Sequence, residues 1–180
     1  TAYKRMKDQG PFSEEDAVNI GMQMAAALKE AHNRGILHRD VKPDNFLLDS
    51  SGRARLADLG LARMDDDGAQ GHLTQDGSAL GTPHYMSPEQ ATGKPADARS
   101  DLYCLGASLY VLASGQTPFE GHTAAAIMVS VITDPPRPLL QAAPALSAGF
   151  VAVVEKLMHK DPAKRFQSAQ EVHEALGRVK

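Results

Sequence analysis

Residues 13–34, with the sequence SEEDAVNIGMQMAAALKEAHNR, have the periodicity of a helix with one apolar face. Ser13 is followed three positions later by Asp16, a variant of the capping box at which many helices begin. Apolar residues then recur at positions 17, 18, 20, 24, 25, 28 and 31, a spacing that predicts one buried face. Gly35 predicts the end of the helix. The fold must therefore supply a core for this face, and the chain after Gly35 emerges from that core as a loop.

A dense run of polar residues, HRDVKPDN at 38–45, follows the apolar pair Ile36-Leu37. Two short extended runs come next, FLLD and RARLA, and the segment SSG between them predicts a hairpin that turns near residues 50–52. Asn45 stands just before the first arm and Asp58 just after the second. Both should lie at the open end of the hairpin, on strands about 5 Å apart.

The remainder of the chain is predicted to be mainly helical, with one long loop. Residues 63–81 are polar, glycine-rich and without periodicity, and such long loops in compact domains are usually functional or disordered. Helices are expected over residues 100–114, 122–133, 147–159 and 168–178, with a proline-rich connector at 134–144. The expected fold class is mainly α, or α+β when the hairpin is counted.

Composition and charge indicate one globular domain. The chain has 180 residues, of which 42% are hydrophobic, and its net charge of −3 gives no basic field for nucleic acid or an anionic membrane. The single cysteine, Cys104, excludes a disulfide framework and favours a reducing compartment; a buried small hydrophobe is preferred over a reactive thiol. The apolar stretch at 102–113 is far shorter than the roughly 20 residues that span a bilayer. Without a signal-peptide pattern either, a cytoplasmic location is expected.

Four polar residues around the hairpin suit phosphate chemistry. Mg²⁺ takes oxygen ligands, and Asp58 and Asn45 offer a carboxylate and an amide on neighbouring strands. A nearby cation can neutralise a transferring phosphoryl group while a second carboxylate accepts a hydroxyl proton, and Lys42 and Asp40 fit these roles. His38 is excluded from this set, because a histidine of this kind is more often a satisfied core residue.

Five motifs, in order, resemble those of protein kinases. They are HRDVKPDN, DLG at 58–60, GTPHYMSPE at 81–89, SDLYCLGASLYVLASGQTPF at 100–119 and KDPAKRF at 160–166. They look like the catalytic loop, the metal motif, the end of the activation segment, the central buried helix and the late arginine motif. The lysine of DVKPDN resembles the serine/threonine branch, and the overall pattern resembles bacterial kinases of that type. The resemblance makes residues 1–180 the C-terminal lobe of a kinase domain, with an activation segment at 58–89.

The resemblance implies a role for each residue near the nucleotide. Asp40 would be the catalytic base, and Lys42 would neutralise phosphate charge beside it. The residues implied in holding ATP and its metal are Lys42, Asp44, Asn45, Leu47 and Asp58. Asn45, counted among the catalytic residues, and Asp58 would bind Mg²⁺, with Mn²⁺ as an alternative, and Leu47 would form the floor under adenine. Thr82 would line the site for the substrate hydroxyl.

Other residues receive structural or regulatory roles from the resemblance. His38 and Asp101 would support the catalytic loop, and Glu89 would pair with Arg165. Taken alone, Asp101 could be a helix N-cap, and Glu89 and Arg165 could be ordinary surface charges. Arg39, next to the base, would clamp a phosphate on the long loop. Thr74 and Ser78 are the candidates for that phosphate, with Thr74 preferred.

The chain also departs from the family pattern. Leu59 replaces the usual phenylalanine of the metal motif and Ser87 replaces an alanine, and neither change removes a catalytic group. The glycine-rich loop, the strand lysine and its glutamate partner are absent, so the chain is expected to be a piece that works with the N-lobe of a parent kinase. The expected function is transfer of the ATP γ-phosphoryl group to Ser or Thr of protein substrates, weak or absent in this piece alone. The alternative is a scaffolding module that docks partners without catalysis.

Overall fold

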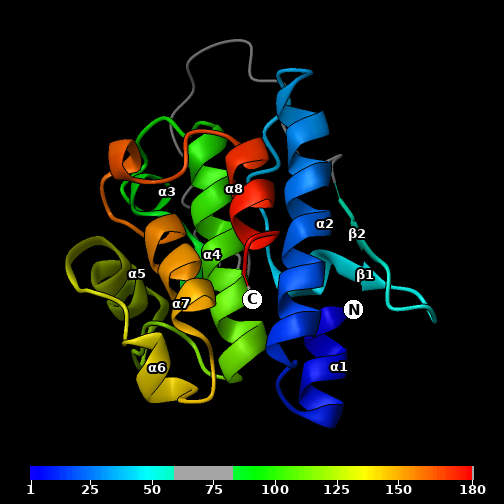
Figure 1. Cartoon of the computed structure of the whole chain (residues 1–180). Helices are drawn as coiled ribbons and strands as arrows, with labels where there is room; N and C mark the ends of the chain where they lie inside the picture. Colours follow the sequence, from blue (N-terminus) through cyan, green and yellow to red (C-terminus); the bar gives the residue numbers. More distant parts are fainter. Residues whose placement is uncertain (59–82, 180) are drawn as a thin grey trace.

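The computed structural model describes residues 1–58 and 83–179. The elements in chain order are α1 (Ala2–Gln9), α2 (Glu14–His32), η1 (Pro43–Asn45), β1 (Phe46–Leu48), β2 (Ala54–Leu56), η3 (Pro83–Tyr85), α3 (Pro88–Ala91), α4 (Ala98–Ser114), α5 (Ala124–Thr133), α6 (Leu139–Ala142), α7 (Ala148–Leu157), η4 (Pro162–Lys164) and α8 (Ala169–Leu176). Figure 1 shows the longer helices around α4 and the β1–β2 hairpin beside α2. The predicted class, mainly α with one small hairpin, is confirmed.

Helix α2 forms where its periodicity predicts it. The Ser13 hydroxyl accepts a hydrogen bond from the Asp16 amide at 3.1 Å and donates to the Asp16 carboxylate at 2.8 Å, so this variant capping box satisfies one free N–H of the first turn. The predicted apolar face is buried except at Val18, which is partly buried and packs against the core. The last helical residue is His32, and Gly35 follows with a φ of 71°, a left-handed conformation that suits glycine. The chain then leaves the helix end toward the 38–45 loop.

Helix α4 is the centre of the core, and all its residues from Ser100 to Ser114 are buried. A helix that is apolar all round must have neighbours on every side. It begins two residues earlier than predicted because Asp97 is the N-cap, with a reciprocal capping box to Ser100. Gly115, with a φ of 70°, ends it. The reading of Asp101 as the N-cap is therefore wrong.

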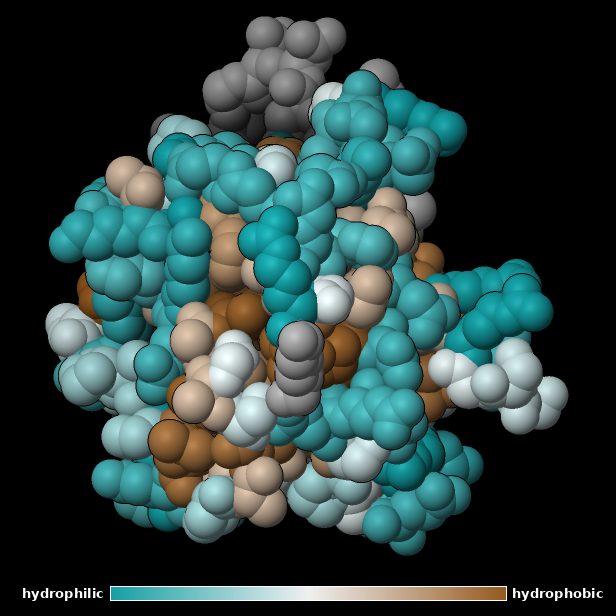
Figure 2. All heavy atoms as spheres, viewed as in Figure 1, coloured by the Kyte–Doolittle hydropathy of each residue, from teal (hydrophilic) through white to brown (hydrophobic). Residues whose placement is uncertain are grey.

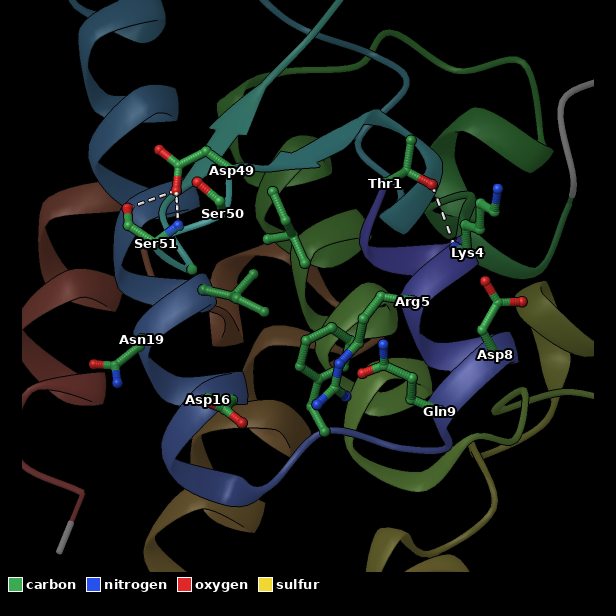
Figure 3. Close-up of a pocket in the computed structure, with 14 residues that line it drawn as sticks. Thr1, Lys4, Arg5, Asp8, Gln9, Asp16, Asn19, Asp49, Ser50 and Ser51 are labelled. Carbon is green, nitrogen blue, oxygen red and sulfur yellow. Dashed lines mark hydrogen bonds between the residues drawn. The ribbon is translucent and has the colours of Figure 1, made fainter.

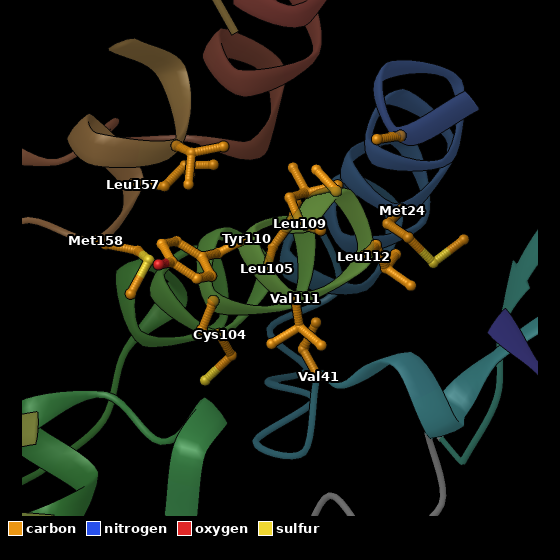
Figure 4. Packing of buried hydrophobic residues seen from close by; sticks show 14 of the residues in the cluster. Met24, Val41, Cys104, Leu105, Leu109, Tyr110, Val111, Leu112, Leu157 and Met158 are labelled. Carbon is orange, nitrogen blue, oxygen red and sulfur yellow. The ribbon is translucent and has the colours of Figure 1, made fainter. Parts of the chain in front are cut away.

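Close approach between helices depends on two glycines. A Cβ on Gly106 of α4 would lie 2.6 Å from the Leu157 Cβ, where α7 crosses α4. A Cβ on Gly21 of α2 would lie 2.9 Å from a methyl group of Leu176 on α8. Figure 4 shows Leu157 and Met158 packed over α4, with Met24 of α2 on its other side. Cys104 is buried in this core, as predicted, and burial raises the pKa of its thiol well above the ordinary value.

The hairpin is confirmed, with an antiparallel register that pairs Phe46 with Leu56 and Leu48 with Ala54. Phe46 is fully buried, which anchors the first strand. The Gln23 side chain on α2 accepts a hydrogen bond from the Ala54 amide at 2.9 Å and so attaches the second strand to the helix. The open end of the hairpin is thereby fixed against the core.

Some elements differ from the expectations. The short helices η3 and α3 precede α4, and α6 lies inside the connector that was expected to be irregular. Figure 2 shows that hydrophilic residues cover most of one face, with hydrophobic residues in the gaps between them. Among the described residues, no helix combines the length and apolar character needed to cross a membrane.

Candidate active site

The backbone of the 38–45 loop is held by one buried carboxylate. Asp101 of α4 is 1% exposed, and its two oxygens accept hydrogen bonds from the His38 amide at 2.9 Å and the Arg39 amide at 2.8 Å. His32, in the last turn of α2, places its Nε2 2.8 Å from the same carboxylate. A buried carboxylate is stable only with such partners. Asp101 therefore ties the start of the loop to the ends of two helices.

His38 connects the loop to the hairpin. Its ring is buried, and its Nδ1 accepts a hydrogen bond from the Asp40 amide at 3.3 Å. Because Nδ1 is the acceptor, Nε2 carries the proton in the neutral ring and donates to the Ala57 carbonyl at 2.8 Å. His38 thus has a partner on each side and leaves neither nitrogen for chemistry in this arrangement.

Three predicted site residues meet directly in the loop. The Lys42 ammonium lies 2.8 Å from Oδ2 of Asp40. The Asn45 side-chain amide donates to the Asp40 carbonyl at 2.7 Å and to Oδ2 at 3.1 Å. The Asp40 side chain is 38% exposed and that of Lys42 20%, so a ligand can reach both. A carboxylate and an ammonium are thereby held at the surface, in contact with the buried amide of Asn45.

Asp58 follows the second strand at the open end of the hairpin. The Ala57 amide donates to the Asn45 carbonyl at 2.8 Å, which closes the open end of the hairpin as predicted. Asp58 follows with a φ of 62°, unusual for a residue other than glycine, and it is exposed. Such backbone conformations gather at functional sites, where the surrounding structure maintains them.

The donor set fits Mg²⁺ on chemical grounds. Because Asn45 uses its amide nitrogen on Asp40, Oδ1 is the atom through which it would bind a metal, and the exposed Asp58 would add a carboxylate. Over residues 1–58 and 83–179, no three histidine, cysteine, aspartate or glutamate side chains cluster as a complete metal site. A metal that uses few protein ligands and completes its shell with phosphate and water matches such a set.

Glu89 and Arg165 form the predicted pair. The guanidinium reaches the two carboxylate oxygens at 2.7 and 2.9 Å, and Arg165 also donates to the carbonyls of His159, Arg99 and Lys160. Arg165 is 2% exposed, so the reading as a surface charge is wrong. Burial acts to raise the pKa of Glu89, but hydrogen bonds from Arg165 and Ser100 outweigh it and lower the pKa below its ordinary value.

Other predicted residues lie at the edge of the described structure or outside it. Asp44 and Leu47 are exposed next to Asn45, and Arg39 is exposed next to Asp40. Thr74, Ser78 and Thr82 lie outside the described residues, as does Leu59. Of the predicted activation segment, 58–89, the structure describes Asp58 and residues 83–89, and the latter form η3 and the start of α3.

The sequence reasoning assigned no role to Gln90 and noted Ser87 only as a departure from the family pattern. Ser87 is the N-cap of α3, and its capping box is completed by Gln90. Gln90 also donates to the Arg39 carbonyl at 2.9 Å, within the 38–45 loop. The sequence contains the relevant signal, since Ser87 and Gln90 have the S-x-x-Q spacing of a capping box. The serine that departs from the family pattern therefore caps a helix, which alanine cannot do.

A cavity of about 690 Å³ lies between α1, the start of α2 and the hairpin turn, and none of its lining residues belongs to the 38–45 loop (Figure 3). Two of its charged side chains have local partners. Arg5 stacks on the Phe12 ring at 3.8 Å, and the Asp49 carboxylate accepts hydrogen bonds from Ser51 within the turn. The predicted site residues Asp40, Lys42 and Asn45 are gathered by the 38–45 loop, and this cavity is a separate feature.

The family model for the protein kinase domain matches residues 2–176, and the chain belongs to that family. Its relatives include a probable serine/threonine-protein kinase of Corynebacterium efficiens, 40% identical over 171 residues. A serine/threonine-protein kinase of Myxococcus xanthus is 42% identical over 172 residues, and one of Mycobacterium tuberculosis is 37% identical over 171. These matches cover 93–95% of this chain, and the chain spans 21–27% of the length of these relatives.

Proposed function

We propose that the loop and hairpin transfer the γ-phosphoryl group of ATP to serine or threonine hydroxyls of protein substrates. The observation that carries the proposal is the contact of Asp40 with both Lys42 and Asn45, on a loop whose backbone is held by Asp101. A scaffold needs the fold of this lobe but has no physical need for this combination of an exposed carboxylate, an ammonium and an amide.

Asp40 acts as the base. Both Lys42 and Asn45 contact its Oδ2, so Oδ1 remains as the acceptor with respect to the described residues. As the substrate oxygen bonds to the γ-phosphorus and the bond to the ADP oxygen breaks, the hydroxyl proton passes to Asp40. Lys42 stands beside this centre and neutralises negative charge on the transferring group.

Asn45 and Asp58 would hold the metal that accompanies the nucleotide. Bound Mg²⁺ would neutralise the phosphate oxygens and orient them for in-line transfer. Asn45 has a second task, because its amide fixes Asp40 relative to the metal ligands. Asp44 and Leu47 lie on the same exposed edge, where Leu47 would contact the adenine.

The proposed activity also requires a second lobe, the N-lobe of a parent kinase, encoded outside these 180 residues. Leu47 is 46% exposed on β1, between the buried Phe46 and the half-buried Leu48. An exposed apolar side chain such as Leu47 would be buried by a bound nucleotide and by the second lobe. We expect the isolated chain to turn over little, because the glycine-rich loop and strand lysine that position phosphates are missing from its sequence.

The test is phosphorylation of a generic protein substrate by the full-length gene product with ATP and Mg²⁺. Asp40→Asn and Asp58→Asn should each lower kcat by about 100-fold or more. Asp49→Asn, which makes the same chemical change at the turn of the hairpin, should leave kcat unchanged. Equal activity of the wild type and Asp40→Asn would refute the proposal, and an inactive, folded wild type would favour the scaffold.

A further inference from the structure

We propose that Gln90 is a positioning residue for Asp40, an inference that rests on the proposed function. Its amide joins the helix that ends the activation segment to the backbone just before the base. The Nε2 atom donates to the Arg39 carbonyl at 2.9 Å across a sequence separation of 51 residues. The contact is therefore a product of tertiary packing between α3 and the catalytic loop.

The other end of the Gln90 amide is held firmly. Its Oε1 accepts hydrogen bonds from the Ser87 amide at 2.9 Å, the Ser87 hydroxyl at 3.0 Å and the Cys104 thiol at 3.3 Å. Cys104 belongs to the buried helix α4. The Nε2 donor is thus aimed at the loop by partners on two different helices, and the side chain cannot turn away without losing these bonds.

The contact holds the loop at Arg39, whose backbone conformation is unfavourable for a residue other than glycine. Arg39 has a φ of 65°, a conformation that non-glycine residues rarely adopt. Asp101 holds the amide of Arg39 at 2.8 Å and Gln90 holds its carbonyl at 2.9 Å, so both backbone polar groups are fixed. The peptide bond between Arg39 and Asp40 is planar, and fixing its carbonyl also fixes the plane from which the Asp40 chain continues.

A small cavity beside the loop gives its backbone room to move if the contact is lost. A cavity of about 30 Å³ lies against the contact, close to the volume of one water molecule. Its lining residues are Arg39, Asp40, Val41, Tyr85, Met86, Gln90 and Cys104. Without the Gln90 donor, the loop has room to relax toward this cavity, and a shift of the base by a fraction of an ångström reduces the rate of transfer.

Two variants separate the loss of this donor from the effect of the chemical change itself. Gln90→Glu keeps an oxygen for Ser87 but replaces the donor that faces the Arg39 carbonyl with an acceptor. Gln141→Glu makes the same chemical change at an exposed position on α6. In the full-length gene product, we expect Gln90→Glu to lower kcat about tenfold with the KM for ATP unchanged, and Gln141→Glu to stay within about twofold of wild type. If the carboxylate prevents folding, Gln90→Met serves instead, since it has similar length and no charge.

Amide hydrogen exchange gives a readout that does not depend on activity. Exchange of the backbone amides at 38–42 should accelerate in Gln90→Glu and remain at the wild-type rate in Gln141→Glu. Equal kcat and exchange in Gln90→Glu and wild type would overturn the inference, as would equal losses in the two variants. Failure of the proposed function is distinguishable, because wild type and Asp40→Asn would then have the same activity, while exchange would still report on the contact.

Discussion

The Arg165 guanidinium and the Glu89 carboxylate form two parallel hydrogen bonds, of 2.7 and 2.9 Å, although the residues stand 76 positions apart. Glu89 belongs to α3 and Arg165 directly follows η4. The pair therefore attaches α3 to the chain that follows η4, near the C-terminus. Because Arg165 is buried, its charge depends on this partner.

Replacement of Glu89 should be costly. Glu89→Ala leaves the Arg165 charge buried without its carboxylate, and we expect the free energy of unfolding to fall by about 3 kcal/mol, measured by urea denaturation. Glu155→Ala, at an exposed position on α7, is the control and should change stability by less than about 0.5 kcal/mol. Similar losses of unfolding free energy in the two variants would show that the Glu89–Arg165 pair contributes no more than an ordinary surface residue.

The contribution of Glu89 should depend on pH in a defined direction. Its pKa in the folded protein lies below the ordinary value of 4.5, because hydrogen bonds from Arg165 and Ser100 outweigh burial. As pH falls, Glu89 is protonated in the unfolded state before it is protonated in the folded state. This stabilisation is therefore complete above pH 4.5 and is lost as pH falls through the folded pKa. The stability difference between wild type and Glu89→Gln should be constant above about pH 5 and shrink at lower pH. A difference that grows on acidification would contradict the assigned direction.

Asp101→Asn should weaken both the fold and the catalytic loop. Two carboxylate oxygens accept from His32 and from the amides of His38 and Arg39, and an asparagine offers only one oxygen for these donors. We expect a loss of about 2 kcal/mol in the free energy of unfolding, together with a fall in kcat.

The matched control is Asp97→Asn, the same change at the N-cap of the same helix. Asparagine caps helices about as well as aspartate, so stability and kcat should both stay close to wild type. If Asp97→Asn were as damaging as Asp101→Asn, the effect would belong to α4 in general rather than to the loop contact.

Gly106→Ala should destabilise the core despite the higher helix propensity of alanine. The new methyl group would lie 2.6 Å from the Leu157 Cβ and 3.0 Å from Met158, so α7 has to move away from α4. We expect a loss of about 2 kcal/mol, measured by thermal unfolding. At Gly149 on α7 the nearest atom to a new Cβ is 3.8 Å away, and Gly149→Ala should stabilise the helix by up to about 1 kcal/mol. The change in stability is therefore expected to have opposite signs in Gly106→Ala and Gly149→Ala.

Local patterns in the sequence determined the elements that carry the site. The Ser13 cap and the apolar spacing after it are sufficient for α2, and the SSG turn is sufficient for the hairpin, because these signals act between residues close in the chain. The hairpin in turn brings the chain after β2 to the carbonyl of Asn45. Residue types and their spacing in HRDVKPDN also indicated the chemistry before any geometry was known.

Tertiary structure decided which of these residues are held and by what. Asp101 contacts the loop from 62 and 63 positions away, and Gln90 contacts Arg39 from 51 positions away. Such contacts depend on how α3 and α4 pack against the loop, which no local periodicity records. The same holds for Arg165, whose burial follows from neighbours distant in sequence. Asp101, Glu89 and Arg165, which taken alone could be a helix cap and surface charges, instead hold the loop and α3 in place. Packing largely removes these side chains from water, so their hydrogen bonds are made to protein groups.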